Sequence, residues 1–471
     1  MPSRNTSTAA DVFSLSHQMI PALAIAASGV AFFLSSGLGV LWPLAWLAPI
    51  PVLLVAFKRS QRTAALIAFF SYFLGSFTIL GLFRVGGLII FAAPPTIAFT
   101  LAVLATKSAI SRLPAWAAAL VFPAVFTAYE FLYSSISPNG TYWSLGYSQT
   151  DFLSLLQIVS ITGLWGVIFL LTLVPSAVAV SWHRRTPSPL VPAFLLLLCA
   201  VGYGTVRLSG SRGEGGGVVG VTALDSAGGS ASDLARAYSD RIRKLAAEGA
   251  EIVVVPEKLV EARPPDEDAA MQPFRDVART ARVAIVVGLN RTTTPRHNVA
   301  VVIGRRGEVI AEYEKHHLVP LIESAFAAGT APRLFEGPRS QWGVEICKDM
   351  DFPAWSREYG RRGVRLLAVP ALDFVKDGRV HSRMALTRGV ENGFAVARAA
   401  GQGRVTLSDA YGRVLVEQES AADGQVVQHL EAGPGATVYT KYGDWFGWVT
   451  VLILVALLVA MVVPVATAGR K

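Results

Sequence analysis

The chain is poor in cysteine and in charged residues. Only two of its 471 residues are cysteines, and because Cys199 lies in a hydrophobic segment, Cys347 has no obvious disulfide partner. Charged residues make up 16% of the sequence and hydrophobic residues 52%, a balance that excludes an ordinary soluble enzyme. The sequence also shows no internal repeat, no metal-ligand spacing and no signal-peptide cleavage pattern, so we expect no metal site and no removed leader.

The apolar residues are concentrated in the N-terminal part of the chain and at its C-terminal end, whereas the middle has an ordinary share of charge. A helix needs about 20 consecutive apolar residues to cross a bilayer. Eight runs approach that length, seven before the charged middle and one after it: 18–36, 38–57, 63–82, 88–106, 113–134, 153–181, 189–207 and 446–464. The pattern predicts a polytopic α-helical membrane domain that carries a soluble insert.

The net charge of +9 does not indicate nucleic acid binding, because many basic residues lie in short loops between the apolar runs. Loops on one side of the expected bundle, with the C-terminal tail, hold most of them: Lys58, Arg59, Arg62, Lys107, Arg112, His183, Arg184, Arg185, Arg470 and Lys471. Since positive loops stay in the cytoplasm, we expect both termini there. The expected divisions are a membrane domain over 1–207, an extracytoplasmic domain over 208–445, and a last span with a short tail over 446–471.

A linker rich in glycine and serine, 209–217, precedes the insert, in which short β-branched runs alternate with helical stretches. This alternation predicts an α/β domain with helices that cover sheets. We expect strands at 218–224, 251–255, 283–289, 299–303, 309–313, 343–347 and 364–369, helices at 231–248 and 381–398, and a hairpin turn at 409–413.

Three residues with reactive side chains, Glu257, Lys315 and Cys347, follow or close predicted strands. A carboxylate in such a place can act as a general base and an ammonium can stabilise an oxyanion. A thiol near a helix start can have a lowered pKa and ionise to the thiolate. Taken alone, each residue also fits a structural role, as a solvated glutamate, a surface lysine or a buried cysteine.

Together the three residue types meet a definite chemical need. Splitting an ester or amide through a thioester requires a nucleophile, a base that activates it and a cation for the tetrahedral intermediate. Functional groups collect at the carboxyl ends of strands in open α/β sheets, so all three can converge on one site.

The motifs around these residues resemble a known signature. They are Pro256-Glu257, Tyr313-Glu314-Lys315-His316-His317-Leu318-Val319-Pro320 and Ile346-Cys347. They look like the Glu–Lys–Cys signature of the nitrilase superfamily, and its membrane-embedded branch, the apolipoprotein N-acyltransferase family, is similar over nearly the whole chain. Segments 142–149 and 437–445 resemble the sequences that precede the sixth and last spans of that family.

The resemblance implies a fold and an activity. The fold is a nitrilase-like α-β-β-α sandwich inserted between seven spans and one. The activity is transfer of a fatty acyl chain from a membrane phospholipid, through a Cys347 thioester, to the amine of diacylglyceryl-cysteine in lipoproteins. The resemblance implies that this reaction needs no cofactor. It also implies that the protein lies in the cytoplasmic (inner) membrane of a bacterium, with its catalytic domain in the periplasm.

Further site residues are carried over from the resemblance. Glu323 and Asp349 are expected to support the three catalytic residues, and the segment Leu321–Thr330 is a candidate lid. The candidate substrate or lid contacts are Trp143, His317, Lys348 and Asp373.

The sequence also departs from the family. Cys347-Lys348-Asp349 stands where the family usually has Cys-Tyr-Glu. The continuation through Phe352 and Pro353 is closer to soluble amidases. A membrane-tethered amidase or nitrilase that hydrolyses small amides or lipid esters is therefore the first alternative. A non-enzymatic membrane scaffold is the second, and the presence of all three catalytic residue types argues against it.

Overall fold

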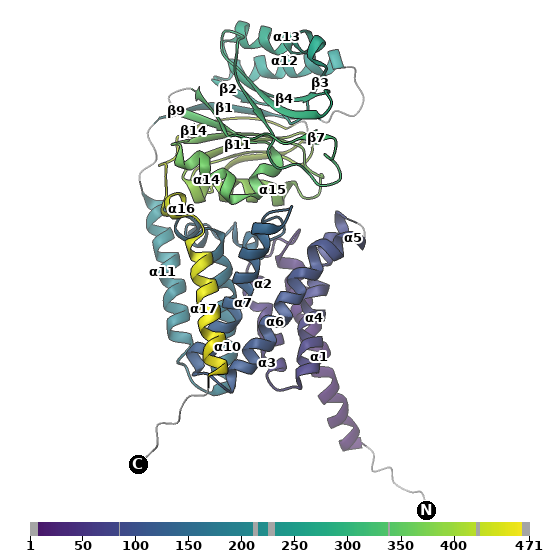
Figure 1. Ribbon diagram of the computed structural model, residues 1–471, viewed down its shortest axis with the longest axis vertical. Helices are drawn as coiled ribbons and strands as arrows, with labels where there is room; N and C mark the ends of the chain where they lie inside the picture. Colours follow the sequence, from purple (N-terminus) through teal and green to yellow (C-terminus); the bar gives the residue numbers. More distant parts are fainter. Residues whose placement is uncertain are drawn as a thin grey trace, which may run out of the picture.

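The computed structural model describes residues 8–83, 85–210, 215–224, 231–337, 340–420 and 424–463, with side chains from residue 19 onward. The chain forms a bundle of apolar helices and an α/β domain that sits on one end of the bundle (Figure 1). The expected linker residues 211–214 and the basic residues 470 and 471 lie outside the described residues.

The helical bundle contains most of the apolar sequence. Its elements are α1 (Thr8–Ser35), α2 (Leu44–Leu47), α3 (Pro49–Ala56), α4 (Gln61–Gly75), η1 (Ser76–Gly81), α5 (Val85–Gly87), η2 (Leu88–Ala92), α6 (Ala93–Ile110), α7 (Ala115–Ile136), η3 (Leu145–Gln149), α8 (Leu153–Leu156), α9 (Val159–Thr162), α10 (Leu164–Arg184), α11 (Leu190–Ser209), α16 (Val438–Tyr442) and α17 (Trp445–Val462). Among the described residues, six helical stretches are long and apolar enough to cross a membrane: Gln61–Gly81, Val85–Ile110, Ala115–Ile136, Leu164–Arg184, Leu190–Ser209 and Trp445–Val462.

Three of the eight predicted runs differ from the structure. The runs 18–36 and 38–57 are not among these six stretches but give the shorter apolar helices Met19–Ser35 and Leu44–Ala56, and the run 153–181 is not one helix. Gly163 breaks the run 153–181, because its φ of 65° is left-handed and α10 begins one residue later. A Cβ atom on Gly163 would lie 2.6 Å from Cε2 of Tyr439, so glycine also permits close packing against α16.

The α/β domain contains two sheets. The first has eight strands: β1 (Gly216–Thr222), β2 (Ile252–Val254), β3 (Val260–Ala262), β4 (Ala284–Arg291), β5 (Arg296–Ile303), β6 (Val309–Glu314), β7 (Phe326–Ala327) and β14 (Gln425–Glu431). The second has six: β8 (Arg333–Gly337), β9 (Ser340–Val344), β10 (Leu366–Ala371), β11 (Ala395–Ala400), β12 (Arg404–Ser408) and β13 (Val414–Glu419). The helical elements are α12 (Ala231–Ala247), α13 (Pro264–Ala281), η4 (Cys347–Asp351), α14 (Pro353–Arg361) and α15 (Gly378–Asn392).

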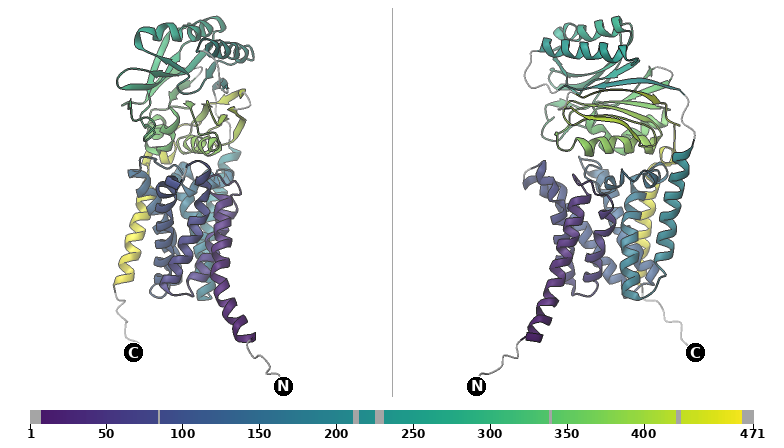
Figure 2. Two further views of the ribbon diagram at one scale, coloured as in Figure 1. Left: turned by 90° about the vertical axis from the view of Figure 1, so that its right-hand side faces the viewer. Right: turned by 180° about the vertical axis from the view of Figure 1, so that it is seen from behind.

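The two sheets lie face to face between two pairs of helices. Helices α12 and α13 cover the sheet farther from the bundle, and α14 and α15 cover the nearer one (Figures 1 and 2). Inward-facing side chains such as Ile252, Val286, Trp342 and Leu366 form one buried cluster between the sheets. Apolar faces of strands are buried in this way because each sheet needs a partner layer. The architecture is an α-β-β-α sandwich, as the resemblance implied.

One predicted helix of the sandwich is wrong at its end. The range 381–398 was expected to be helical throughout, but α15 ends at Asn392 and β11 follows. Gly393 takes the left-handed conformation (φ 73°) that commonly stops a helix. Residues 395–400 therefore form strand β11 of the second sheet and are not part of α15.

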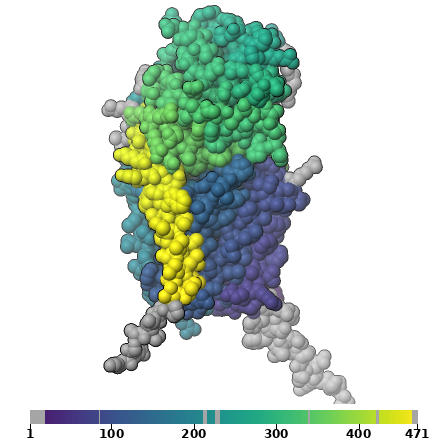
Figure 3. Space-filling view, in the orientation of Figure 1, coloured from purple at the N-terminus to yellow at the C-terminus, as the bar shows by residue number. Residues whose placement is uncertain are grey.

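Hydrogen bonds and ion pairs join the sandwich to the bundle. Arg388 of α15, fully buried, donates to the Tyr147 hydroxyl at 2.9 Å. Asp444, which precedes α17, accepts from Trp165 of α10 and from Arg357 of α14, both at 2.8 Å. Figure 3 shows the sandwich seated directly on the helices across one face of the molecule. Buried charged contacts of this kind need fixed geometry, so they hold the two parts in one arrangement.

We expect Gly163→Ala to destabilise the protein. With φ 65° and ψ −172°, Gly163 lies in a region that is almost restricted to glycine, so a residue with a Cβ atom there costs about 1–3 kcal/mol, and the contact with Tyr439 adds to that. Thermal unfolding in detergent micelles at a fixed scan rate measures the loss. The matched control is Gly202→Ala in α11, where nothing lies within 4 Å of the added Cβ atom. Equal midpoints for the two variants would contradict the packing described for Gly163.

Candidate active site

Strand ends bring three sequence-predicted residues to one place. Glu257 lies three residues after β2, Lys315 directly follows β6, and Cys347 lies three residues after β9, at the start of η4. The ammonium Nζ of Lys315 lies 2.9 Å from Oε1 of Glu257. The Cys347 thiol is within electrostatic range of both side chains. The three side chains therefore come together after the carboxyl ends of their strands, as the sequence predicted.

Lys315 lies between two carboxylates. Its Nζ is 2.9 Å from Oε1 of Glu257 and 3.0 Å from Oε2 of Glu323, and all three side chains are at most 2% exposed. Burial lowers the pKa of Lys315, but the nearby negative charges outweigh burial and leave the pKa above its usual range. The ammonium therefore stays charged in the site.

Two residues that the sequence did not single out complete this ion cluster. The Asn298 amide donates to Oε1 of Glu257 at 2.6 Å and to Oε1 of Glu323 at 2.9 Å. Lys258 forms an ion pair with Glu323, so two lysines face two glutamates. Burial raises the pKa of Glu323, but the charges of Lys315 and Lys258 outweigh it and lower the pKa to about 2. A polar residue near the start of an apolar strand was the only sequence signal for Asn298.

The second oxygen of Glu257 has a different environment. The Lys315 ammonium and the Asn298 amide both donate to Oε1 of Glu257. Oε2 is buried and accepts no hydrogen bond from any described residue. Because a buried acceptor without a partner is costly, it marks a place where a proton donor is needed. The carboxylate is thus oriented by one oxygen and able to accept a proton with the other.

Cys347 has a strained backbone and a buried thiol. Its φ is 45°, in the left-handed region that residues other than glycine rarely adopt, and such strain clusters at functional sites. Burial, and next the negative charge of Glu257, raise the pKa of the thiol well above its usual range, although Lys315 opposes this. The prediction of a thiolate favoured at rest is therefore wrong. The thiol is enclosed rather than partly exposed, and it needs a base.

Asp349 holds the turn of Cys347 against the loop of Lys315. Its carboxylate accepts from the Tyr313 hydroxyl at 2.6 Å, from the His317 backbone N–H at 2.7 Å and from the Ile346 N–H at 3.2 Å. The expected supporting residue thus lies beneath the nucleophile, fully buried. His317, expected as a substrate contact, stacks on the ring of Phe352 at 3.6 Å and bonds to Asp349.

Another candidate contact, Asp373, lies within electrostatic range of the thiol. Asp373 is buried and forms an ion pair with Arg398 of β11, and both charges act on Cys347. Arg398 is a functional residue that the sequence reasoning missed, because the predicted helix over 381–398 included it. Its signal was a lone arginine in the run of small apolar residues from 395 to 400.

The turn that carries Cys347 rests on the membrane domain. Lys348 donates to the Asn139 side chain at 3.1 Å, and the Thr141 hydroxyl and N–H both donate to the carbonyl of Asp351. Trp143, in the same loop, lines one pocket between the two domains and a second pocket formed by the bundle and its loops. The candidate lid segment begins with Leu321 and Ile322, which are 91% and 61% exposed. The site therefore faces the bundle.

Known proteins are similar to this chain in both parts. Residues 28–177 match the family model of the apolipoprotein N-acyltransferase N-terminal domain, and residues 230–430 match the carbon-nitrogen hydrolase model. An apolipoprotein N-acyltransferase of Geobacter metallireducens is 26% identical, over 90% of this chain and 92% of that protein. One of Bradyrhizobium diazoefficiens is 26% identical, over 79% of this chain and 77% of that protein.

Other known proteins are similar to a smaller part of the chain. A 2-oxoglutaramate amidase of Bacillus subtilis is 28% identical, over 32% of this chain and 64% of that protein. A crystal structure of an amidase from Nesterenkonia sp. aligns with a TM-score of 0.42 and 23% identity, over 50% of this chain and 96% of that one.

The two family models match successive parts of the chain, and the match to the apolipoprotein N-acyltransferase of Geobacter metallireducens covers 90% of the chain. The chain belongs to the apolipoprotein N-acyltransferase family of the nitrilase superfamily, and it is an N-acyltransferase enzyme.

Proposed function

We propose that this chain transfers a fatty acyl group from a membrane phospholipid to the N-terminal amine of diacylglyceryl-cysteine in lipoproteins. The acyl group is carried between them as a thioester on Cys347. The observation that supports this most strongly is the arrangement of Glu257, which is oriented by Lys315 through Oε1 while Oε2 accepts no described donor. That carboxylate lies beside a buried thiol that needs a base.

In the first half-reaction, Glu257 takes the thiol proton as the sulfur attacks the ester carbonyl carbon of the phospholipid. The carbonyl oxygen becomes an oxyanion, which Lys315 and the backbone N–H of Lys348 stabilise. That N–H makes no hydrogen bond to another described residue. The carbon–oxygen bond then breaks, Glu257 returns the proton to the leaving oxygen, and a lysophospholipid departs. Such oxyanion donors typically contribute a factor on the order of 10²–10³ in rate.

In the second half-reaction, the neutral amine of the acceptor attacks the thioester carbonyl. The same cation and N–H hold the oxyanion, and Glu257 removes a proton from the attacking nitrogen. The carbon–sulfur bond breaks, the amide forms, and the proton returns to the sulfur of Cys347. Use of one base in both directions follows from the symmetry of the two steps.

The proposed topology has eight spans with both termini in the cytoplasm and the catalytic domain outside it. Basic loops gather at one end of the bundle, where Lys107 donates to the carbonyls of Ala56 and Phe57 and Arg184 donates to that of Leu113. The sandwich lies at the other end (Figure 1). The positive-inside rule then assigns the basic end to the cytoplasm of a bacterial inner membrane. In this account the domains are 1–207, 208–445 and 446–471, and both substrates keep their chains in the bilayer.

A burst experiment tests the transfer. Purified protein in detergent micelles is mixed with acyl-labelled phospholipid and no acceptor, and about one lysophospholipid per protein should be released at once. A synthetic diacylglyceryl-cysteine peptide, added next, should take up the label. Glu257→Gln should slow the burst by about 10²–10⁴-fold, as expected for loss of a general base. Glu248→Gln, at an exposed position in the same domain, serves as the control.

Two outcomes contradict the proposal. Release of labelled free fatty acid with no labelled peptide would favour the hydrolase alternative. Absence of any lysophospholipid from the parent protein would reject acyl transfer from this donor.

The state of the thiol gives a second prediction, measured as the pH dependence of alkylation by iodoacetamide. A Cys199→Ser background removes the other, exposed thiol. Because the folded protein raises the pKa of Cys347, alkylation should be slow at neutral pH and rise as pH increases toward that pKa. Loss of the negative charge in Glu257→Gln should move the curve to lower pH, and loss of the cation in Lys315→Met should move it higher. Coinciding curves would show that these charges do not act on the sulfur.

A further inference from the structure

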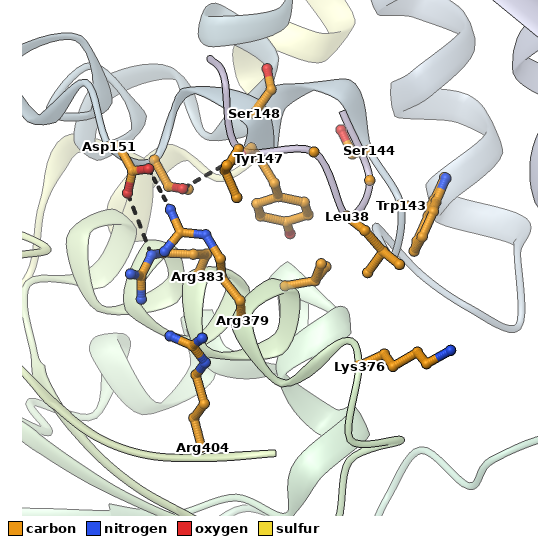
Figure 4. Close-up of a pocket in the computed structure, with 15 residues that line it drawn as sticks. Leu38, Trp143, Ser144, Tyr147, Ser148, Asp151, Lys376, Arg379, Arg383 and Arg404 are labelled. Atoms are coloured by element: carbon orange, nitrogen blue, oxygen red, sulfur yellow. Dashed lines mark hydrogen bonds and ion pairs between the residues drawn. The ribbon is translucent and has the colours of Figure 1, made fainter. Parts of the chain in front are cut away.

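A pocket of about 190 Å³ lies between the two domains. Its lower wall comes from membrane-domain loops, including Gly37–Val40 and residues between Ser144 and Asp151. Its upper wall comes from the sandwich and carries four cations: Lys376, Arg379, Arg383 and Arg404. Figure 4 shows Arg379 and Arg383 beside Asp151, Arg404 farther from Asp151, and Lys376 apart from the arginines, toward the end of the pocket where Trp143 lies.

The pocket has more positive than negative charge. Asp151 is the one carboxylate in the wall, where it pairs with Arg379 and lies 3.5 Å from Nε of Arg383. Behind the wall, Glu417 pairs with Arg383 and Arg404. Glu419 lies 3.3 Å from Arg404 and is largely exposed. With all three carboxylates counted against the four cations, one positive charge remains in excess.

One cation of the wall lacks a partner. Lys376 is exposed and its ammonium has no ion-pair or hydrogen-bond partner in the part of the chain that the structure describes. Nε of Arg383 is buried 3.5 Å from Oδ1 of Asp151, within ion-pair distance, and makes no hydrogen bond to a described residue. A guanidinium has five N–H donors in a planar fork that matches the oxygens of a phosphate group. The wall therefore presents cationic donors of the kind that bind phosphate.

The surroundings of the pocket are those of a lipid head group. Val40 and Leu41, at the end of the bundle, are 52% and 49% exposed. On the sandwich, Phe374 and Val375 precede Lys376 and are 43% and 61% exposed. The molecule thus places apolar side chains beside a basic wall at the level where spanning helices end. That is the arrangement an anionic amphiphile requires.

We propose that this pocket binds the phosphate group of an outer-leaflet glycerophospholipid, the acyl donor of the reaction proposed above, on which this inference rests. The acceptor has no phosphate and carries an ammonium at its reactive end. A basic pocket attracts the donor and repels the acceptor, so it serves only the first half-reaction. It thereby separates two lipid substrates that share the same diacylglyceryl body.

The pocket is linked to the nucleophile through the chain. Cys347 Sγ lies 3.6 Å from the carbonyl of Leu372, and Lys376 follows four residues later. Asp377 accepts from the N–H of Phe374 at 3.0 Å and fixes the intervening loop. One short loop therefore connects Lys376 of the pocket to the residue whose carbonyl contacts the thiol. The ester of a lipid whose phosphate the pocket holds could then reach Cys347.

The test compares phosphatidylglycerol with diacylglycerol of the same chains, and measures acyl-enzyme formation on the full-length protein in micelles. The parent should prefer phosphatidylglycerol. Lys376→Glu should slow acylation from subsaturating phosphatidylglycerol about tenfold, the loss of one charge-assisted contact, and leave diacylglycerol unchanged. Lys441→Glu is the matched control, an exposed lysine of α16 outside the pocket.

A second variant distinguishes phosphate binding by the arginines from a purely structural role of their ion pairs. Asp151→Asn removes the carboxylate that competes for Arg379 and Arg383, so it should speed acylation from phosphatidylglycerol. If the ion pair only holds the domains together, the same variant should slow acylation from both lipids. Transfer from preformed acyl-enzyme to the acceptor peptide should be unchanged in both variants.

Binding to the Cys347→Ala variant, followed by native mass spectrometry, distinguishes failure of the pocket from failure of the proposed reaction. Retention of phosphatidylglycerol over diacylglycerol, lost in Cys347→Ala with Lys376→Glu, supports the pocket even if no acyl-enzyme forms. Equal retention of the two lipids overturns it. Equal retention together with Lys376-dependent thermal stabilisation by sodium phosphate, relative to sodium chloride, would assign the pocket to a free anion instead.

Discussion

The site depends on the burial of a charged lysine between two glutamates. A buried ion without a partner costs several kcal/mol, and removal of one partner from a buried pair typically costs about 3–5 kcal/mol. Lys315, Glu257 and Glu323 therefore have to stay together, and Lys258 and Asn298 satisfy what remains. One consequence is geometric. The cluster fixes one oxygen of Glu257 and leaves the other without a described hydrogen-bond partner, within a carboxylate whose charge acts on the thiol. The carboxylate that the cluster needs for its structure is therefore also the one proposed as the base.

A second constraint is the contact between the sandwich and the bundle. The nucleophile turn rests on the membrane-domain loop through Lys348, Asp351 and the residues that meet them. Helix α15 is anchored to the bundle by the buried Arg388. In the proposed reaction, this contact brings the nucleophile to the level where lipid esters lie, which gives a physical reason for joining these two parts in one chain.

The sequence alone predicted the residues that follow strands, because strand ends are marked by a change from apolar to polar residues. It did not predict partners that come from other strands. Asn298 and Arg398 act on Glu257 and Cys347 only through the register of the sheets, which one sequence does not reveal. The state of the thiol was also mispredicted, because burial depends on how both sheets and the bundle close over it.

The helix boundaries show the same limit. Hydropathy identified the apolar runs, but it could not see that the positive φ of Gly163 ends one helix and begins another. Likewise, Gly393 stops α15 within a pattern that would have allowed it to continue. At both glycines the helix ends because of the backbone conformation, which the amino-acid composition does not predict.

The central claim is that the sulfur of Cys347 carries a fatty chain. Intact-mass analysis of the protein taken directly from membranes, before any substrate is added, tests this most directly. The account predicts a fraction of molecules heavier by one fatty acyl group, with the added mass removed by neutral hydroxylamine and absent from Cys347→Ser. An unmodified mass in the parent protein, or an acyl mass that persists in Cys347→Ser, would contradict it.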